Sequence, residues 1–120
     1  MDIKEFNKSY FEFLEYIKKY NKSSKYAMFY QKNYLLKKTN PKLIITLWNR
    51  RISPYHESII NGDVSFFMNG SFEEIDSAEV QNNIHYFKEL YQLMPDEHKP
   101  GFVKHVQIIT NNCYRYFNKL

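Results

Sequence analysis

The sequence predicts an all-α protein, a compact bundle of four or five helices in which residues 1–120 form a single domain. Three observations predict this class. Apolar residues recur three and four positions apart along several segments, which is the spacing of one face of an α-helix. No run of alternating apolar and polar residues, the pattern typical of a strand, stands beside that spacing. With 120 residues and 43% hydrophobic content, the chain suffices for one core.

The first and last segments have the most regular helical spacing. Near the start, apolar residues three or four positions apart line one face, while Lys and Glu fill the other. These residues are Ile3, Phe6, Tyr10, Phe13, Ile17 and Tyr20. Near the end, the same spacing links Phe102, Val106, Ile109, Cys113, Tyr116 and Leu120. We expect two long amphipathic helices that bury these stripes.

A second helix is expected after the polar break at residues 21–24. Ser24 is a plausible N-cap, because its hydroxyl can accept a hydrogen bond from the first turn. Lys37 and Lys38 suit the carboxyl end of the helix. Its expected apolar face consists of Tyr26, Phe29, Tyr30, Tyr34 and Leu35.

Proline and glycine divide the middle of the chain into two short helices. Pro41 disfavours helix at Asn40 but suits the first position of a new helix, whose face is Ile44, Leu47, Trp48 and Ile52. Pro54 repeats this signal, and Gly62 can end the next helix in a left-handed conformation. That helix would carry Tyr55, Ile59 and Ile60. Residues 63–70 fit either a short helical turn or a brief extended segment.

A further helix precedes the last one. Two capping-box patterns, Ser71 with Glu74 and Asp76 with Glu79, predict that it begins between them. Its apolar face is expected to be Val80, Ile84, Phe87, Tyr91 and Met94. Residues 95–101 contain two Pro and one Gly, which predicts a connector or one short turn before the last helix.

Charge is unevenly distributed along the chain. Residues 1–60 carry twelve basic and five acidic residues, a balance of +7, whereas residues 61–120 have a balance of −3. The best candidate for phosphate or nucleic-acid contact is the set Lys32, Lys37, Lys38, Lys42, Arg50 and Arg51, with Tyr26, Tyr30 and Tyr34 interleaved. The alternative is a solvated helix face beside core tyrosines. An A/T-rich genome would also enrich the chain in Lys and Tyr.

No pattern of residues predicts catalysis, a metal site or a cofactor. Three Gly are too few for a dinucleotide fingerprint or a P-loop, and the four His have no metal-ligand spacing. Cys113 lies on an apolar stripe, as a small buried hydrophobe does, and Glu73, Glu74, Asp76 and Glu79 fit helix capping. We therefore expect no catalytic residues, no metal ligands and no cofactor.

Sequence features also bear on the cellular compartment. A single Cys cannot form an intramolecular disulfide, which favours a reducing compartment. No apolar stretch approaches the roughly 20 residues of a membrane-spanning helix, and the first residues lack a signal-peptide core. We expect an intracellular protein without a membrane span.

One stretch of the sequence resembles a known family. Residues 48–55 (WNRRISPY), followed by Ile59-Ile60, Gly62-Asp63 and Phe66-Phe67, resemble uncharacterised small helical proteins of nucleocytoplasmic large DNA viruses. Residues 86–91 and 108–116 look similar too, so the resemblance covers residues 43–117. It implies a mostly helical viral protein in the infected host cytoplasm or the virion, and it transfers no activity.

These observations favour a non-enzymatic protein that acts through protein contacts, with itself, a virion component or a host factor. Abundant Tyr, 11 residues of 120, suits interfaces. Phe66, Phe67 and Met68 either pin a loop onto the bundle or form an exposed anchor for a partner. Nucleic-acid binding by the basic first half is the alternative function, and an enzyme is third.

Overall fold

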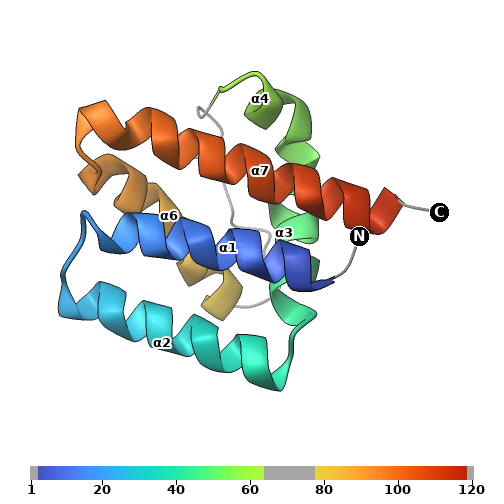
Figure 1. The fold of residues 1–120 in the computed structure, drawn as a ribbon, viewed down its shortest axis with the longest axis horizontal. Helices are drawn as coiled ribbons and strands as arrows, with labels where there is room; N and C mark the ends of the chain where they lie inside the picture. Colours follow the sequence, from blue (N-terminus) through green and yellow to red (C-terminus); the bar gives the residue numbers. More distant parts are fainter. Residues whose placement is uncertain (1–2, 64–77, 119–120) are drawn as a thin grey trace.

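The computed structural model describes residues 3–63 and 78–118 (Figure 1). All regular structure in these ranges is helical, with no strand, so the predicted all-α class is confirmed. Five helices have seven or more residues, and the five-residue α4 is a sixth. The helices are α1 (Ile3–Lys18), α2 (Ser24–Thr39), α3 (Leu43–Arg51), α4 (His56–Ile60), α6 (Ala78–Leu93) and α7 (Lys99–Asn118). Two 3₁₀ turns, Ser53–Tyr55 and Asp96–His98, precede α4 and α7.

Three helices form one layer of the molecule. Helix α1 lies between α2 and α7, and α3 and α6 pack behind this layer (Figure 1). The molecule measures 39 × 32 × 27 Å along its principal axes. The middle helix therefore keeps one side turned toward solvent, while its other side forms the centre of the core.

Helices α1 and α7 bury the stripes that the sequence predicts. On α1, Phe6, Tyr10, Phe13 and Ile17 are buried, and Ile3 packs against the edge of the core, as does Tyr20 in the turn after the helix. On α7 the buried residues are Phe102, Val106, Ile109 and Cys113. Regular three-and-four spacing gives one continuous apolar face, and its burial is the main favourable term in folding.

Aromatic rings from four helices meet in this core. The ring of Phe13 lies 4.9 Å from that of Phe102 and 5.6 Å from that of Phe87, measured between centroids. Trp48 of α3 packs edge-on against Tyr10, and its indole Nε1 donates a hydrogen bond of 3.0 Å to Thr110 Oγ1 of α7. The one buried indole N–H is thus satisfied, as burial of a polar group requires.

Helix α2 differs from the prediction at its start and on its apolar face. Ser23, not Ser24, is the N-cap, and its Oγ accepts a hydrogen bond of 3.1 Å from the Tyr26 backbone N–H. Leu35, expected to be buried, is 60% exposed, whereas Asn33 is 2% exposed. Asn33 Oδ1 accepts from the Tyr10 hydroxyl at 2.8 Å, and its Nδ2 donates to the Phe29 carbonyl at 2.8 Å. These bonds allow a polar side chain to take the buried position.

The middle helices begin slightly later than the prolines suggest. Pro41 lies in a turn, and α3 begins at Leu43, because the Leu43 N–H donates back to the Asn40 carbonyl. The Pro54 region forms a 3₁₀ turn before α4 begins at His56. Gly62 ends this region with a φ of +78°, as its predicted left-handed role requires. In α4, Ile59 is buried but Ile60 is 47% exposed.

The short turn expected within residues 95–101 is the 3₁₀ turn Asp96–His98, but the last helix begins before the end of this range. After the 3₁₀ turn Asp96–His98, α7 begins at Lys99 and includes Pro100 and Gly101 in its first turn. Proline is tolerated there because the first N–H groups of a helix need no intrahelical acceptor.

Helix α6 is described from Ala78 onward, and its side chains from Tyr86. Phe87 and Met94 are buried and Tyr91 packs at the edge of the core, as predicted, together with buried Tyr86 and Leu90. The capping boxes at Ser71–Glu74 and Asp76–Glu79, the side chains of Val80 and Ile84, and Leu120 lie outside the described residues.

Candidate functional site

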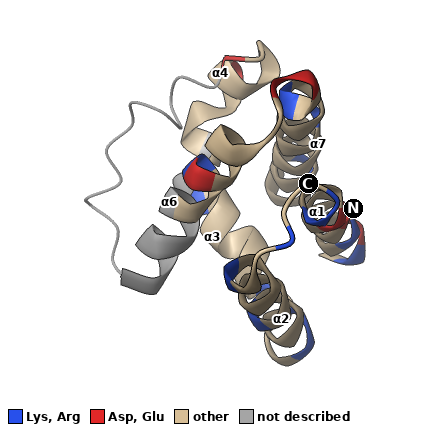
Figure 2. Cartoon of the chain, turned by 90° about the vertical axis from the view of Figure 1, so that its left-hand side faces the viewer, with Lys and Arg blue, Asp and Glu red and all other residues tan. Residues whose placement is uncertain are grey.

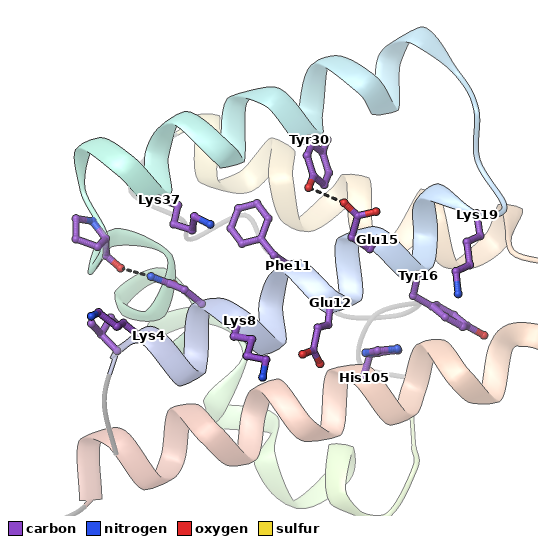
Figure 3. A pocket seen from close by; sticks show the side chains of 13 residues that line it. Lys4, Lys8, Phe11, Glu12, Glu15, Tyr16, Lys19, Tyr30, Lys37 and His105 are labelled. Atoms are coloured by element: carbon purple, nitrogen blue, oxygen red, sulfur yellow. Dashed lines mark hydrogen bonds between the residues drawn. The ribbon is translucent and has the colours of Figure 1, made fainter.

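A shallow groove of about 920 Å³ runs along the outward side of α1, between α2 and α7 (Figure 3). We call it the α1 groove. Helix α1 provides most of its lining, α2 and the following turn provide one wall, and α7 provides His105. The lining residues are Ile3, Lys4, Asn7, Lys8, Phe11, Glu12, Glu15, Tyr16, Lys19, Tyr30, Lys37, Pro41 and His105.

The floor of the α1 groove is aromatic. Phe11, 9% exposed, lies beneath it, and the ring of Tyr30 packs edge-on against Phe11 with 5.9 Å between centroids. Lys37 Nζ lies 4.8 Å from the centroid of the Phe11 ring, in a cation–π contact. Phe11 is therefore held in place from two sides.

One end of the α1 groove is closed by a link between α1 and the turn before α3. Asn7 Nδ2 donates a hydrogen bond of 3.1 Å to the Pro41 carbonyl, which fixes the orientation of the Asn7 amide. Asn7 Oδ1 is buried and has no hydrogen-bond partner among the described residues. The Pro41 carbonyl thus links α1 to the turn before α3.

Charged side chains of both signs line the α1 groove, where Lys4, Lys8, Lys19 and Lys37 are basic and Glu12 and Glu15 are acidic. Lys4 and Lys8 lie in the first half of α1, and Glu12 and Glu15 lie in the second (Figure 3). Glu15 Oε1 accepts a hydrogen bond of 2.7 Å from the Tyr30 hydroxyl. This bond, with burial second, raises the pKa of Tyr30 to about 12.

Two of these charged residues, Lys8 and Glu12, differ from Glu15, which accepts a hydrogen bond from Tyr30. Both are exposed, and neither makes a hydrogen bond or an ion pair within the described part of the chain. They lie one helical turn apart on the same side of α1. Both charges therefore remain available to an incoming molecule.

His105 lies at the α7 side of the α1 groove. Its ring stacks on Phe13, with 5.9 Å between centroids, and lies 4.9 Å from the ring of Tyr16. Burial lowers the pKa of His105, Lys104 and Lys19 lower it further, and Glu12 opposes them. The imidazole is therefore neutral near pH 7 and contributes an aromatic surface. The scattered His spacing in the sequence gave no signal of this position.

The predicted basic residues come from α2, from the turn that follows it and from the end of α3. Lys37 and Lys38 end α2, where their Nζ atoms lie 5.1 Å and 4.7 Å from the centroid of the Tyr34 ring. Lys42 lies in the next turn, whereas Arg50 and Arg51 are the last two residues of α3, about 12 Å farther along its axis. Lys32 lies on the exposed side of α2.

The three tyrosines expected between these basic residues make contacts within the protein. Tyr26 is 1% exposed, and its hydroxyl donates a hydrogen bond of 2.6 Å to the Leu14 carbonyl. Tyr30 and Tyr34 are half-buried, and their rings are covered by Lys18 and by Lys37 and Lys38. Tyr26 therefore belongs to the core and has no free face for a base.

Of the two other sequence-based candidates, Cys113 lies within the described residues. Cys113 is buried where α7 meets α3, and its Sγ lies 3.8 Å from the Ile45 carbonyl oxygen, as expected for a core thiol. Phe66, Phe67 and Met68 lie outside the described residues. Within residues 3–63 and 78–118, no group of three or more His, Cys, Asp or Glu side chains gathers as a metal site would require.

Comparison of the chain with protein families, with curated proteins and with solved structures finds no match. None of the described helices is long and apolar enough to cross a membrane.

Proposed function

We propose that this chain is a non-enzymatic protein that acts through protein contacts, and that the α1 groove is its contact surface. The lining of that groove is the observation that carries the proposal. Aromatic and aliphatic side chains form the floor, and charged side chains form the rim. This composition is typical of protein interfaces, where aromatic anchors lie at the centre and polar groups surround them.

The resemblance of residues 43–117 to proteins of large DNA viruses extends the proposal to the partner. A virion component or a factor of the infected host would then occupy the groove, unless the partner is a second copy of the chain. The groove itself lies mainly on α1, outside the residues that carry the resemblance.

A site-specific cross-linking experiment tests the contact surface. In one variant a photoreactive amino acid replaces Lys8, inside the α1 groove. In a second variant it replaces Lys22, which is exposed in the connection between α1 and α2. Illumination of a nuclease-treated lysate of the producing cells should yield protein adducts from position 8 that position 22 does not give. Replacing Phe11 with Ala should weaken those adducts, because the floor loses its ring.

The variant with the photoreactive residue at position 22 is the control for specificity. Equal adducts from both positions, or adducts that survive Phe11→Ala unchanged, would contradict a contact surface at the α1 groove. Removal of nucleic acid before illumination ensures that any adduct reflects a direct protein contact.

Nucleic-acid binding is the second candidate, and one observation favours it. Helix α2 carries Lys25, Lys32, Lys37 and Lys38 and no acidic residue (Figure 2). A surface that neutralises phosphates binds less tightly as salt rises, because counterions compete. Affinity for single-stranded or duplex DNA and RNA should then fall steeply between low and physiological salt, and Lys37→Glu with Lys38→Glu should abolish binding. A flat salt dependence would contradict this candidate.

A further inference from the structure

The longest stretch of the sequence without an acidic residue surrounds α2. Residues 16–56 contain ten Lys or Arg and no Asp or Glu. Helix α2 lies at the edge of the molecule in both views (Figure 1, Figure 2), and its 16 residues extend over about 24 Å. One side of this helix is therefore an elongated basic surface that faces solvent.

The same side of α2 carries two exposed apolar side chains. Met28 is 73% exposed and Leu35 is 60% exposed. Seven positions, or about two helical turns, separate them, so the two side chains lie on one line along the helix. A single exposed apolar residue is ordinary, but two aligned residues offer a partner apolar contact along the helix.

Lysines flank this apolar pair. Lys25 lies to one side of the line through Met28 and Leu35, and Lys38 lies to the other, as 3.6 residues per turn require. All four side chains are exposed, and we call this side of the helix the outer α2 face. Lysine stems can lie along an apolar layer while their ammonium groups reach polar groups at its surface.

The charges near the outer α2 face are mostly positive. Lys25 Nζ lies 3.0 Å from Glu89 Oε2 of α6, in an exposed ion pair that contributes little and can exchange partners. Lys38 Nζ lies 4.7 Å from the centroid of the Tyr34 ring, a contact that does not neutralise its charge. Lys32 lies on the same side and interacts within the protein, so the charge argument does not use it.

Positive charge continues beyond both ends of the outer α2 face. Lys22 is exposed in the connection before α2, and Lys42 is exposed in the turn that follows it. Together with Lys38, these residues place ammonium groups along the whole length of the helix. A flat anionic surface would contact all of them at once.

The apolar residues distinguish between anionic partners. Single-stranded nucleic acid binds by stacking its bases on exposed aromatic rings. The outer α2 face offers the aliphatic side chains of Met28 and Leu35 instead, while Tyr26 is buried and lysines cover the rings of Tyr30 and Tyr34. Aliphatic side chains flanked by lysines suit a lipid surface, where apolar groups enter the head-group boundary and lysines meet anionic head groups.

From these observations we infer that the outer α2 face binds the surface of a membrane that contains anionic lipid. Met28 and Leu35 enter the boundary between head groups and acyl chains, and Lys22, Lys38 and Lys42 contact the anionic head groups. The inference goes beyond the proposed function, because the outer α2 face and the α1 groove are separate surfaces.

Vesicle binding tests the apolar part of the contact. The purified protein should sediment with vesicles of phosphatidylcholine and phosphatidylserine in a two-to-one ratio, but not with vesicles of phosphatidylcholine alone. Met28→Ser combined with Leu35→Ser should weaken this binding by about tenfold or more, because both apolar side chains are lost. Leu93→Ser is the matched control, since Leu93 is 63% exposed on α6, and it should leave binding unchanged.

A second pair of variants tests the position of the charge. Lys38→Glu should weaken vesicle binding by about tenfold or more, because one positive charge near an anionic membrane contributes about fivefold and the change reverses it. Lys104→Glu alters the net charge equally at an exposed residue of α7 and should have a much smaller effect. Circular dichroism checks that each variant keeps the helical fold.

Three outcomes would overturn the inference. One is the absence of binding to the anionic vesicles, and another is equal binding to both kinds of vesicle. The third is anionic binding that survives Met28→Ser with Leu35→Ser unchanged. Binding of DNA or RNA without binding of vesicles would favour the nucleic-acid candidate instead. Adducts from position 8 report on the α1 groove alone, so the proposed function stands or fails separately.

Discussion

Tyr16 shows how one side chain can join several parts of the molecule. Its hydroxyl donates a hydrogen bond of 2.8 Å to the His98 carbonyl, and its ring packs near those of Tyr20 and His105. Gly101 lies directly against it, and a Cβ at that position would lie 2.7 Å from Tyr16 Cζ. Glycine in the first turn of α7 is thus explained by close approach of a neighbouring side chain.

Gly101→Ala should therefore destabilise the protein by about 1 kcal/mol, because overpacking costs more than the better helix propensity of Ala recovers. Urea denaturation measures this change in the free energy of unfolding. In a Tyr16→Ala background the clash is absent, so the same substitution should become stabilising. The same loss in both backgrounds would show that Tyr16 is not the cause.

His105 should make stability depend on pH in one direction. Its folded pKa is lowered from 6.5, chiefly by burial, so the unfolded chain binds more protons as the pH falls through that range. The free energy of unfolding should therefore decrease from about pH 7 to about pH 5. His105→Gln should flatten this part of the profile, measured by urea denaturation at both pH values. Parallel profiles for the two proteins would contradict the assignment to His105.

At the scale of elements, two adjacent serines at the start of α2 have different roles. Ser23 Oγ caps the helix, whereas Ser24 is the first helical residue and is exposed. Ser23→Ala should cost about 1 kcal/mol, because one N–H of the first turn loses its acceptor. Ser24→Ala is the matched control and should be close to neutral. Thermal or urea unfolding of the two variants measures the difference, and a reversed order would restore Ser24 as the cap.

The long helices could be predicted from the sequence because their own residues determine them. In α1 and α7, the three-and-four spacing continues for four turns, and the central residues of each predicted stripe are buried. Helix α2 was harder to predict, because Asn33 replaces Leu35 on its buried side. That exchange depends on the hydroxyl of Tyr10, 23 positions away in sequence. A polar residue bonded across helices has no periodic signal.

The α1 groove could not be predicted for a related reason. Its charged residues were visible in the sequence as the solvated side of a helix, but a groove also needs its walls. These come from Tyr30 and Lys37 of α2, Pro41 of the next turn and His105 of α7. The sequence favours residues 66–68 for contact with a partner and a basic set for contact with nucleic acid, and Lys37 of that set lines the groove. The basic set consists of Lys32, Lys37, Lys38, Lys42, Arg50 and Arg51. The groove itself depends on the packing of α1 between two neighbouring helices.

At the scale of the whole molecule, Cys113 reports on the stability of the fold. It is fully buried, with its thiol between α7 and α3, so a reagent reaches the thiol only when those helices separate. Both helices contribute to one continuous core with α1. Local fraying at a helix end would not expose it, and opening should require the loss of most of the core.

Labelling of Cys113 by a thiol reagent should therefore be slow under native conditions. Protection should match the global unfolding equilibrium, which for small domains is about 10³- to 10⁸-fold, and it should fall with urea in parallel with denaturation. The control places a cysteine at exposed Asn111 in a Cys113→Ser background, where labelling should be immediate. If Cys113 labels as rapidly as the control, α7 separates from α3 locally. The α1–α7 side of the groove would then be a moving surface instead of a fixed wall.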